Sequence, residues 1–110
     1  MESIRKNEDF RVCYRKGRSI AGHYLVIYYR KNGLDRNRLG ISVSKKVGNS
    51  VVRHRITRLV RESWRLHEGE FESGLDIVVV GRRSADGASY YEIETALLGL
   101  LDRAGIHRTS

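Results

Sequence analysis

The sequence predicts a small α/β sandwich in one domain, with helices packed on one side of a sheet of about four strands. Residues 23–31, HYLVIYYRK, are rich in β-branched and aromatic side chains, which favour strands. Residues 39–44 and 75–81 flank a helical pattern at 51–67, and this strand–helix–strand order allows two parallel strands. A chain of 110 residues has the length of one domain, 1–110, with one modest core.

The chain begins with an expected loose arm over residues 1–6, followed by a short helix. The next three residues, NED, are typical of a helix start, because a cap residue precedes acids near the positive end of the helix dipole. The helix is predicted to run to about Lys16 and to end at Gly17.

Two strand regions follow the first helix. Ser19–Gly22 is interpreted as a connection, and residues 23–31 as one strand or two, a choice that the residues leave open. Asn32-Gly33 is a turn signal that favours a hairpin loop. In Arg38–Ser44 large apolar residues alternate with small ones, so one face of this strand is expected to meet the core.

The stretch Lys45–Arg65 combines two lysines, a glycine turn and a helix whose surface is divided. Asn49 or Ser50 is expected to cap this helix. At about 100° per residue, the apolar face consists of Val52, Ile56, Leu59, Val60 and Ser63. The opposite face is basic and holds His54, Arg58, Arg61 and Arg65, with Arg53 and Arg55 on its flanks. Because Glu62 is the single acid among seven Lys or Arg residues, this face is suited to a polyanion.

A loop and a buried strand are predicted after this helix. The helix is expected to end near His67, and residues 68–74 form an acidic loop. Leu75–Gly81 is a nearly continuous apolar run bounded by glycines, which indicates a strand buried on both faces.

A capping box predicts the last helix. Ser89 and Glu92 have the spacing at which each side chain bonds the other's backbone amide. The helix is expected to run to about Ala104 and to end at Gly105, with residues 106–110 as a frayed tail. The full order is therefore α-β-β-β-α-β-α.

Positive charge is concentrated in the first part of the chain. The net charge is +8, and residues 1–44 carry ten basic and four acidic groups, residues 45–65 seven and one, and residues 66–110 four and eight. A polarised basic surface is typical of proteins that bind nucleic acid or an anionic membrane. The helix carries arginine rather than lysine, which favours binding of phosphate through paired hydrogen bonds. The sequence has no apolar run of about 18 residues and no apolar signal segment at its polar start, so we expect a cytoplasmic protein without membrane attachment.

Residue types that support catalysis form no recognisable group. Cys13 is the single cysteine and is expected to be a small buried apolar residue. The histidines lack metal-binding spacing, and residues 1–65 contain too few acids for the clustered carboxylates of a protein-only nuclease. We therefore predict no catalytic residue and no metal site in the protein.

Aromatic residues near the basic segments have two interpretations. Tyr24, Tyr28 and Tyr29 lie in one predicted strand, and Phe10 and Tyr14 lie in the first helix. Taken singly, each is more typical of core packing. Next to so many arginines, one or two of them are expected to form a platform on which single-stranded bases stack.

The run GISVSKKVGNSVVRHRITRLVRE, residues 40–62, resembles the signature of the bacterial ribonuclease P protein subunit family. The segments NEDF and DIVVVGRR and the leucine-rich final helix resemble the family in order and spacing. The resemblance implies an endoribonuclease subunit that binds a catalytic RNA and the single-stranded 5′ leader of precursor tRNA. It further implies that the RNA performs the hydrolysis with Mg²⁺, and that the strand–helix–strand unit has a left-handed crossover. The alternative is a general or ribosome-associated RNA-binding protein with no role in processing.

The expected sites follow from this resemblance and from the divided helix. The expected RNA-binding residues are Lys45, Lys46, Asn49, Arg53, His54, Arg55, Arg58, Arg61 and Arg65. The expected leader cleft, between the sheet and the first helix, contains Phe10, Tyr14, Tyr28 and Ser44. His54 stands where the family has asparagine, and Thr57 where lysine is common. The expected partners are the catalytic RNA and precursor tRNA, with no obligate protein partner.

Overall fold

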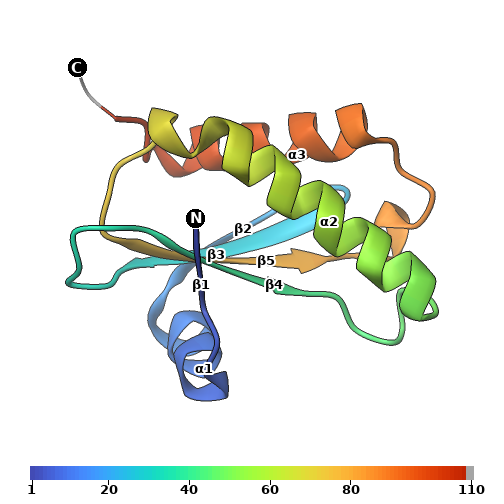
Figure 1. The fold of residues 1–110 in the computed structure, drawn as a ribbon, viewed down its shortest axis with the longest axis horizontal. Coiled ribbons are helices and arrows are strands. Elements are labelled where there is room, and N and C mark those ends of the chain that lie inside the picture. Colours follow the sequence, from blue (N-terminus) through green and yellow to red (C-terminus); the bar gives the residue numbers. More distant parts are fainter. Residues whose placement is uncertain (109–110) are drawn as a thin grey trace.

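A five-stranded sheet with helices on both faces makes up the computed structural model, which describes residues 1–108 (Figure 1). The strand order is β1-β4-β5-β3-β2. β1 (Glu2–Ser3), β4 (Arg38–Ser42) and β5 (Leu75–Gly81) run parallel to one another. β3 (Leu25–Lys31) is antiparallel to β5, and β2 (Arg18–Ala21) is antiparallel to β3. The predicted class and element order are confirmed, with β1 as one further strand ahead of the first helix.

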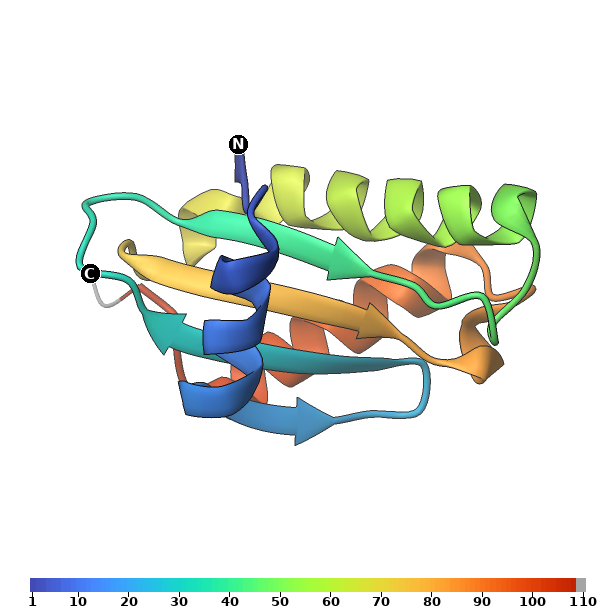
Figure 2. The ribbon, with the colours of Figure 1, turned by 90° about the horizontal axis from the view of Figure 1, so that it is seen from below.

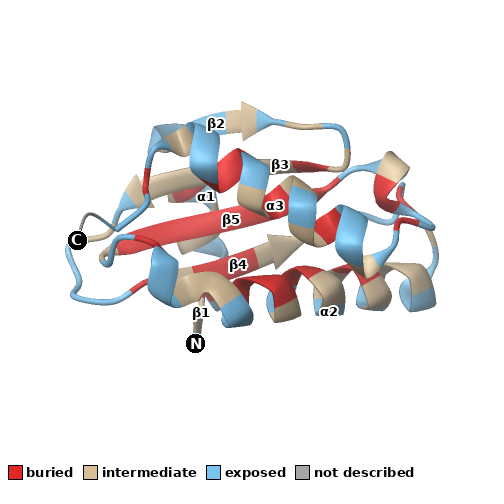
Figure 3. Ribbon diagram, turned by 90° about the horizontal axis from the view of Figure 1, so that it is seen from above, coloured by how far each residue is buried: buried red, intermediate tan, exposed pale blue. Residues whose placement is uncertain are grey.

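The helices divide between the two faces of the sheet, which corrects the expectation that all of them lie on one side. α1 (Asn7–Lys16) covers one face, whereas α2 (Ser50–His67) and α3 (Tyr90–Ala104) cover the other (Figure 1). The reason is β5, which is buried along most of its length (Figure 3). Val78 belongs to a small cluster under α1, and Val79 belongs to the main core under the other two helices. Both faces of this strand are apolar, so both must be covered.

The connection from β4 through α2 to β5 is left-handed, as the family resemblance implies and against the usual right-handed preference (Figures 2 and 3). Viewed from the face that α2 and α3 cover, with β4 and β5 pointing up, β5 lies to the left of β4. α2 begins beyond the end of β4, after the loop of residues 43–49, and runs back along the sheet (Figure 2).

Both ends of the described chain are attached to the fold, which corrects the predicted loose arm and frayed tail. Residues 2–3 form β1, and the amide of Ile4 donates to the carbonyl of Leu39 at 2.8 Å. At the other end, the amide of Glu72 donates to the carbonyl of Ile106 at 2.8 Å. Each terminal segment is held by a buried isoleucine, a contact that the local sequence does not reveal. Residues 109–110 of the predicted tail lie outside the described residues.

β2 occupies residues predicted to form a connection between the first helix and the next strand. Most of its side chains are exposed, so no apolar alternation marks it, and it is held at the sheet edge by backbone pairing with β3. The run at 23–31 forms a single strand, β3, which begins at Leu25. The sheet therefore has five strands rather than about four.

The bounds of α1 agree with the prediction, although its caps differ. Lys6, not Asn7, occupies the N-cap position and makes no side-chain hydrogen bond there. Gly17 ends the helix with an extended backbone. A Cβ at this position would lie 2.4 Å from the carbonyl oxygen of Cys13, so close packing requires the glycine.

The later elements have the predicted bounds. α2 ends at His67, and β5 spans residues 75–81. The capping box is present: the amide of Glu92 donates to Ser89 Oγ at 3.0 Å, and the amide of Ser89 donates to Glu92 Oε1 at 2.9 Å. α3 ends at Gly105, whose φ of 70° lies in the left-handed region that favours glycine.

A buried carboxylate joins three elements on the α1 face. Asp76, at 1% exposure, accepts hydrogen bonds from Arg38 Nε at 2.8 Å and Arg38 Nη2 at 2.6 Å. It also accepts one from Asn32 Nδ2 at 2.9 Å, and Arg38 Nη1 lies 3.4 Å from Asp9 Oδ2 on α1. Burial alone would raise the pKa of Asp76, but the hydrogen bonds from Arg38 and Asn32 outweigh it and hold the pKa below its ordinary value. Asp76 is therefore ionised at neutral pH.

Replacing Arg38 by methionine is expected to lower the free energy of unfolding by about 3 to 5 kcal/mol, because the Asp76 carboxylate would stay buried without its cation. Urea unfolding followed by circular dichroism measures this loss. Arg36→Met is the matched control, since Arg36 pairs with Glu2 and Asp35 at the exposed surface, where such pairs contribute about 1 kcal/mol or less. Equal losses in the two variants would contradict a special role for Asp76.

Candidate nucleic-acid interface

The start of α2 is set by the two residues before it. Asn49 is the N-cap: its Oδ1 accepts a hydrogen bond from the amide of Val52 at 3.0 Å, which settles the choice between Asn49 and Ser50. A Cβ at Gly48 would lie 2.9 Å from the side chain of Val52, so the glycine allows the loop to approach the first turn. The cap and the close approach fix where the basic face of α2 begins.

One face of α2 enters the main core as predicted. Ile56, Val60 and Ser63 are buried, and the hydroxyl of Ser63 donates to the carbonyl of Leu59 at 2.8 Å. The prediction omitted Trp64, which is buried and stacks on Phe71 with ring centroids 5.7 Å apart. Phe71 therefore anchors the loop after α2 to the core, although most residues of this loop are charged or polar.

The opposite face of α2 is exposed and carries the predicted basic side chains: His54, Arg58, Arg61 and Arg65. Arg65 pairs with Glu62 at 2.5 Å, one turn away on the same helix. Among the described residues, Arg58 and Arg61 form no salt bridge. Their guanidinium groups are therefore available to an external anion.

The flank of α2 that faces β4 forms a small hollow of about 210 Å³, lined by Ile41, Val43, Arg53, His54 and Thr57. Within residues 1–108, Arg53 Nε is one of two buried side-chain nitrogen or oxygen atoms without a hydrogen-bond partner. Thr57, where the family commonly has lysine, donates its hydroxyl to the carbonyl of Arg53 at 2.9 Å. Arg53 thus brings an unused donor to this hollow. Arg55, the other flanking arginine, is partly exposed, and Lys45 and Lys46 are exposed in the loop before the helix.

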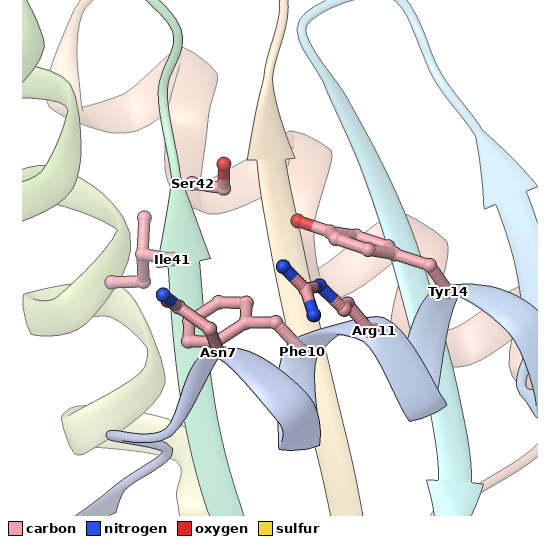
Figure 4. A pocket seen from close by; sticks show the side chains of 6 residues that line it. All are labelled: Asn7, Phe10, Arg11, Tyr14, Ile41 and Ser42. Carbon is pink, nitrogen blue, oxygen red and sulfur yellow. The ribbon is translucent and has the colours of Figure 1, made fainter.

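A second hollow, of about 320 Å³, lies between α1 and β4 (Figure 4). It is lined by Asn7, Phe10, Arg11, Tyr14, Ile41 and Ser42. The four residues from α1 lie on one side of that helix, and Ser42 lies across the hollow on β4. Phe10 and Tyr14 were predicted for this place.

The aromatic residues of this region differ in how much of each ring is free. The ring of Phe10 packs directly on Gly40 of β4, where a Cβ would be 2.7 Å from the ring. Tyr28 is half-buried and meets the ring of Tyr14 edge-on, with centroids 4.9 Å apart. Tyr14 is 38% exposed and is the ring that a ligand can reach most easily. Phe10 and Tyr14 therefore line the hollow, whereas Tyr28, predicted for the cleft, does not line it and packs on Tyr14 from β3.

The residues that line this hollow differ from the predicted cleft residues at several positions. Ser44 is exposed in the loop after β4 and does not line the hollow, whereas Ser42 does. The prediction also omitted Asn7 and Arg11, which extend the Tyr14 side of α1 at helical spacing, a signal that was available in the sequence. Tyr24, a second aromatic candidate, instead donates its hydroxyl to Glu92 on α3 at 2.6 Å.

The two hollows adjoin at β4. Ile41 lines both of them, one toward α1 and one toward α2. β1 pairs with Arg38 and Leu39, so within residues 1–108 the outer edge of β4 beyond Leu39 has no strand partner. A continuous surface therefore runs from α1 across the end of β4 to the basic face of α2.

Cys13 and the possible metal-binding side chains are the remaining candidates for a chemical role. Cys13 is fully buried, and burial, aided by the nearby charge of Asp76, raises the pKa of its thiol to about 11. This confirms its predicted packing role. Across residues 1–108, no three His, Cys, Asp or Glu side chains gather into a group that could hold a metal ion. Nor is any helix in this part of the chain long and apolar enough to span a bilayer.

Comparison with known proteins assigns the family. The family described as Ribonuclease P matches residues 1–105. The chain belongs to the ribonuclease P protein family. Among its relatives, the ribonuclease P protein component of Lachnoclostridium phytofermentans is 57% identical over 90% of this chain and 85% of that protein. The protein component of Alkaliphilus metalliredigens is 52% identical over 89% of this chain and 88% of that protein.

Solved ribonuclease P proteins have the same fold. The Staphylococcus aureus protein superposes with a TM-score of 0.90 at 38% identity, covering 98% of this chain and 99% of that one. The Thermotoga maritima protein superposes with a TM-score of 0.85 at 36% identity, covering 94% and 97% of the two chains. The predicted function, a protein subunit of the endoribonuclease ribonuclease P, is thereby confirmed over a general RNA-binding protein. Membership in the family implies the ribonuclease P RNA as partner.

Replacing Asn49 by alanine is expected to lower the free energy of unfolding by about 0.5 to 2 kcal/mol, because the amide of Val52 loses its cap. Urea unfolding measures the effect. Ser50→Ala is the matched control, since Ser50 is the first helical residue and does not hold the cap position. A larger loss for Ser50→Ala than for Asn49→Ala would show that the cap is assigned to the wrong residue.

Proposed function

We propose that this ribonuclease P protein binds the phosphates of the catalytic RNA through α2 and the single-stranded 5′ leader of precursor tRNA in the hollow beside α1. The observation that carries the proposal is the continuous surface across β4, which joins unpaired arginines to an aromatic hollow. A chain of nucleotides has the same two properties, a charged backbone and flat bases.

The basic face of α2 supplies the affinity in this proposal. Arg58 and Arg61 are exposed and form no salt bridge within residues 1–108, and Arg53 lines the hollow on the β4 flank of the same helix. A guanidinium group can donate two parallel hydrogen bonds to one phosphate. Each phosphate neutralised releases counterions, so binding through this face depends strongly on salt.

The hollow beside α1 supplies contacts suited to an unpaired strand. Tyr14 offers a partly exposed ring on which a base can stack, and such stacking contributes about 1 to 3 kcal/mol per base. Arg11 offers a cation for the backbone, and Asn7 offers an amide for a base edge. Because the hollow lies against the sheet, it admits a single strand more readily than a duplex.

The chemistry of cleavage belongs, in this proposal, to the RNA component and its Mg²⁺ ions. The described side chains provide no group of carboxylates at the hollow that could hold a metal ion for hydrolysis. The part assigned to the protein is to bind and orient the leader and the RNA. The bacterial relatives favour the cytoplasm as the place where it works.

Replacing Arg58 and Arg61 together by glutamine is expected to weaken binding to ribonuclease P RNA and to reduce the slope of log K against log salt by about 1.5 to 2. Filter binding over a series of salt concentrations measures the slope. Arg65→Gln is the matched comparison, because Arg65 already pairs with Glu62 and should change the slope less. An unchanged slope in the double variant would contradict phosphate binding by α2.

Replacing Tyr14 by alanine is expected to weaken binding of leader-bearing precursor tRNA by about 5- to 100-fold, because one base loses its stacking partner. The measurement is binding and 5′ processing by the enzyme reconstituted with ribonuclease P RNA at low magnesium. Leaderless tRNA should bind as before. Tyr91→Ala is the matched control, since Tyr91 is 72% exposed on α3, across the sheet from the hollow. Equal losses with and without a leader would place the leader elsewhere.

A further inference from the structure

The positive charge of the first 44 residues is only partly explained by the surfaces described so far. This segment contains ten Lys and Arg residues. Three of them pair with acids: Arg11, Arg36 and Arg38. Ten minus three leaves seven, none of which forms a salt bridge within residues 1–108. Four of these seven line a single hollow of about 490 Å³: Lys16, Arg18, Arg30 and Lys31.

These four residues, here called the β3-end patch, meet because of the topology. Lys16 ends α1 and Arg18 begins β2, while Arg30 and Lys31 end β3 (Figure 2). β3 is antiparallel to β5, so its last residue lies beside Leu75, the first residue of β5. The basic face of α2, by contrast, begins beside the other end of the parallel strands. From there α2 runs back along the β4 side of the sheet, whereas the patch lies on its β3 and β2 side, so the two surfaces lie at opposite edges of the sheet (Figure 2).

The charge balance of the patch is unfavourable for the isolated protein. Arg30 lies opposite Asp76 in the pairing of β3 with β5, and the other three cations, Lys16, Arg18 and Lys31, have one acid among the lining residues, Glu72. Like charges around one hollow repel each other, and a bound anion offsets this repulsion. Three of the cations, Lys16, Arg18 and Lys31, are exposed and can reach an external ligand.

The chemistry of the lining selects the kind of anion. Guanidinium and ammonium groups spread around a hollow of this size suit several phosphates rather than one carboxylate. The one aromatic residue of the lining, Tyr29, is half-buried and packs on the main core, so no free ring is offered to a base. Contacts of this type recognise a nucleic-acid backbone without reading its sequence.

We propose that the β3-end patch is a second RNA-binding surface, which holds the phosphate backbone of an RNA segment distinct from those on α2 and in the leader hollow. The proposal rests on the proposed function, because the RNA is one that this protein meets in ribonuclease P. Two RNAs present the same chemistry there, the ribonuclease P RNA and the body of precursor tRNA. The molecule has extents of 37 × 30 × 22 Å and the two surfaces lie at opposite edges of the sheet, so we assign the patch an RNA segment other than the one on α2.

The test replaces Arg18 and Lys31 together by glutamine. Both side chains are exposed, so the fold should be retained, which circular dichroism and urea unfolding verify. The slope of log K against log salt is measured for ribonuclease P RNA alone, and for precursor tRNA bound to the reconstituted enzyme. In one of these two assays the slope should fall by about 1.5 to 2. The matched control is Arg5→Gln with Arg103→Gln, which removes the same charge from exposed positions outside the patch.

The outcomes separate the two RNA sources and the two proposals. A lower slope with ribonuclease P RNA alone assigns the patch to that RNA, and a lower slope only with precursor tRNA assigns it to the substrate. An unchanged slope in both assays, or an equal fall in the control, overturns the proposal. If the Arg58 and Arg61 variant still lowers the slope, the function proposed for α2 stands without the patch. If neither the Arg58 and Arg61 variant nor the Arg18 and Lys31 variant lowers the slope, both proposals are wrong.

Discussion

The arrangement of this protein depends on the buried carboxylate of Asp76. Its charge lies inside the fold at the start of β5, where an unpaired ion would cost several kcal/mol. Arg38 on β4 neutralises it and also reaches Asp9 on α1, while Asn32 adds a hydrogen bond from the end of β3. Together these bonds connect α1 and the end of β3 to β4 and β5. Because α1 forms one wall of the hollow, the same ion pair positions the residues proposed to bind the leader.

The shape of that hollow depends on small residues in β4. Gly40 leaves room for the ring of Phe10 directly on the strand, and Ser42 continues the small face toward the open end. A larger side chain at either position would lift α1 or fill the hollow. Tyr28 on β3 packs against the ring of Tyr14, so the more exposed ring is held in place.

The arginines have two distinct roles, and whether an arginine pairs with an acid shows which role it has. Arg38 and Arg36 pair with acids and connect elements of the fold. Arg58 and Arg61 have no such partner among the described residues, although a surface helix ordinarily places acids one turn away. A cation without an acidic partner is well solvated by water, and its free energy falls further beside a phosphate. Arg58 and Arg61 therefore mark where RNA is expected to bind.

The elements formed by local pattern were predictable from the sequence. The bounds of α2 and β5, the capping box of α3 and the buried position of Cys13 follow from periodicity and capping chemistry, which act over a few residues. β1 and β2 were not predictable, because short edge strands are held by backbone pairing with partners distant in sequence. The placement of Ser42 rather than Ser44 in the hollow has the same origin, since the packing of α1 on β4 selects it.

The sequence by itself determined the divided surface of α2 and the class of partner, because charge and helical periodicity are properties of a single segment. It also determined the family, through the long motif at residues 40–62. Only the tertiary structure decided that α1 lies on the opposite face, that the two hollows meet at Ile41, and that Lys16, Arg18, Arg30 and Lys31 share one hollow. These facts depend on which segments the sheet brings together, and strand order is settled by long-range burial and pairing that no local pattern encodes.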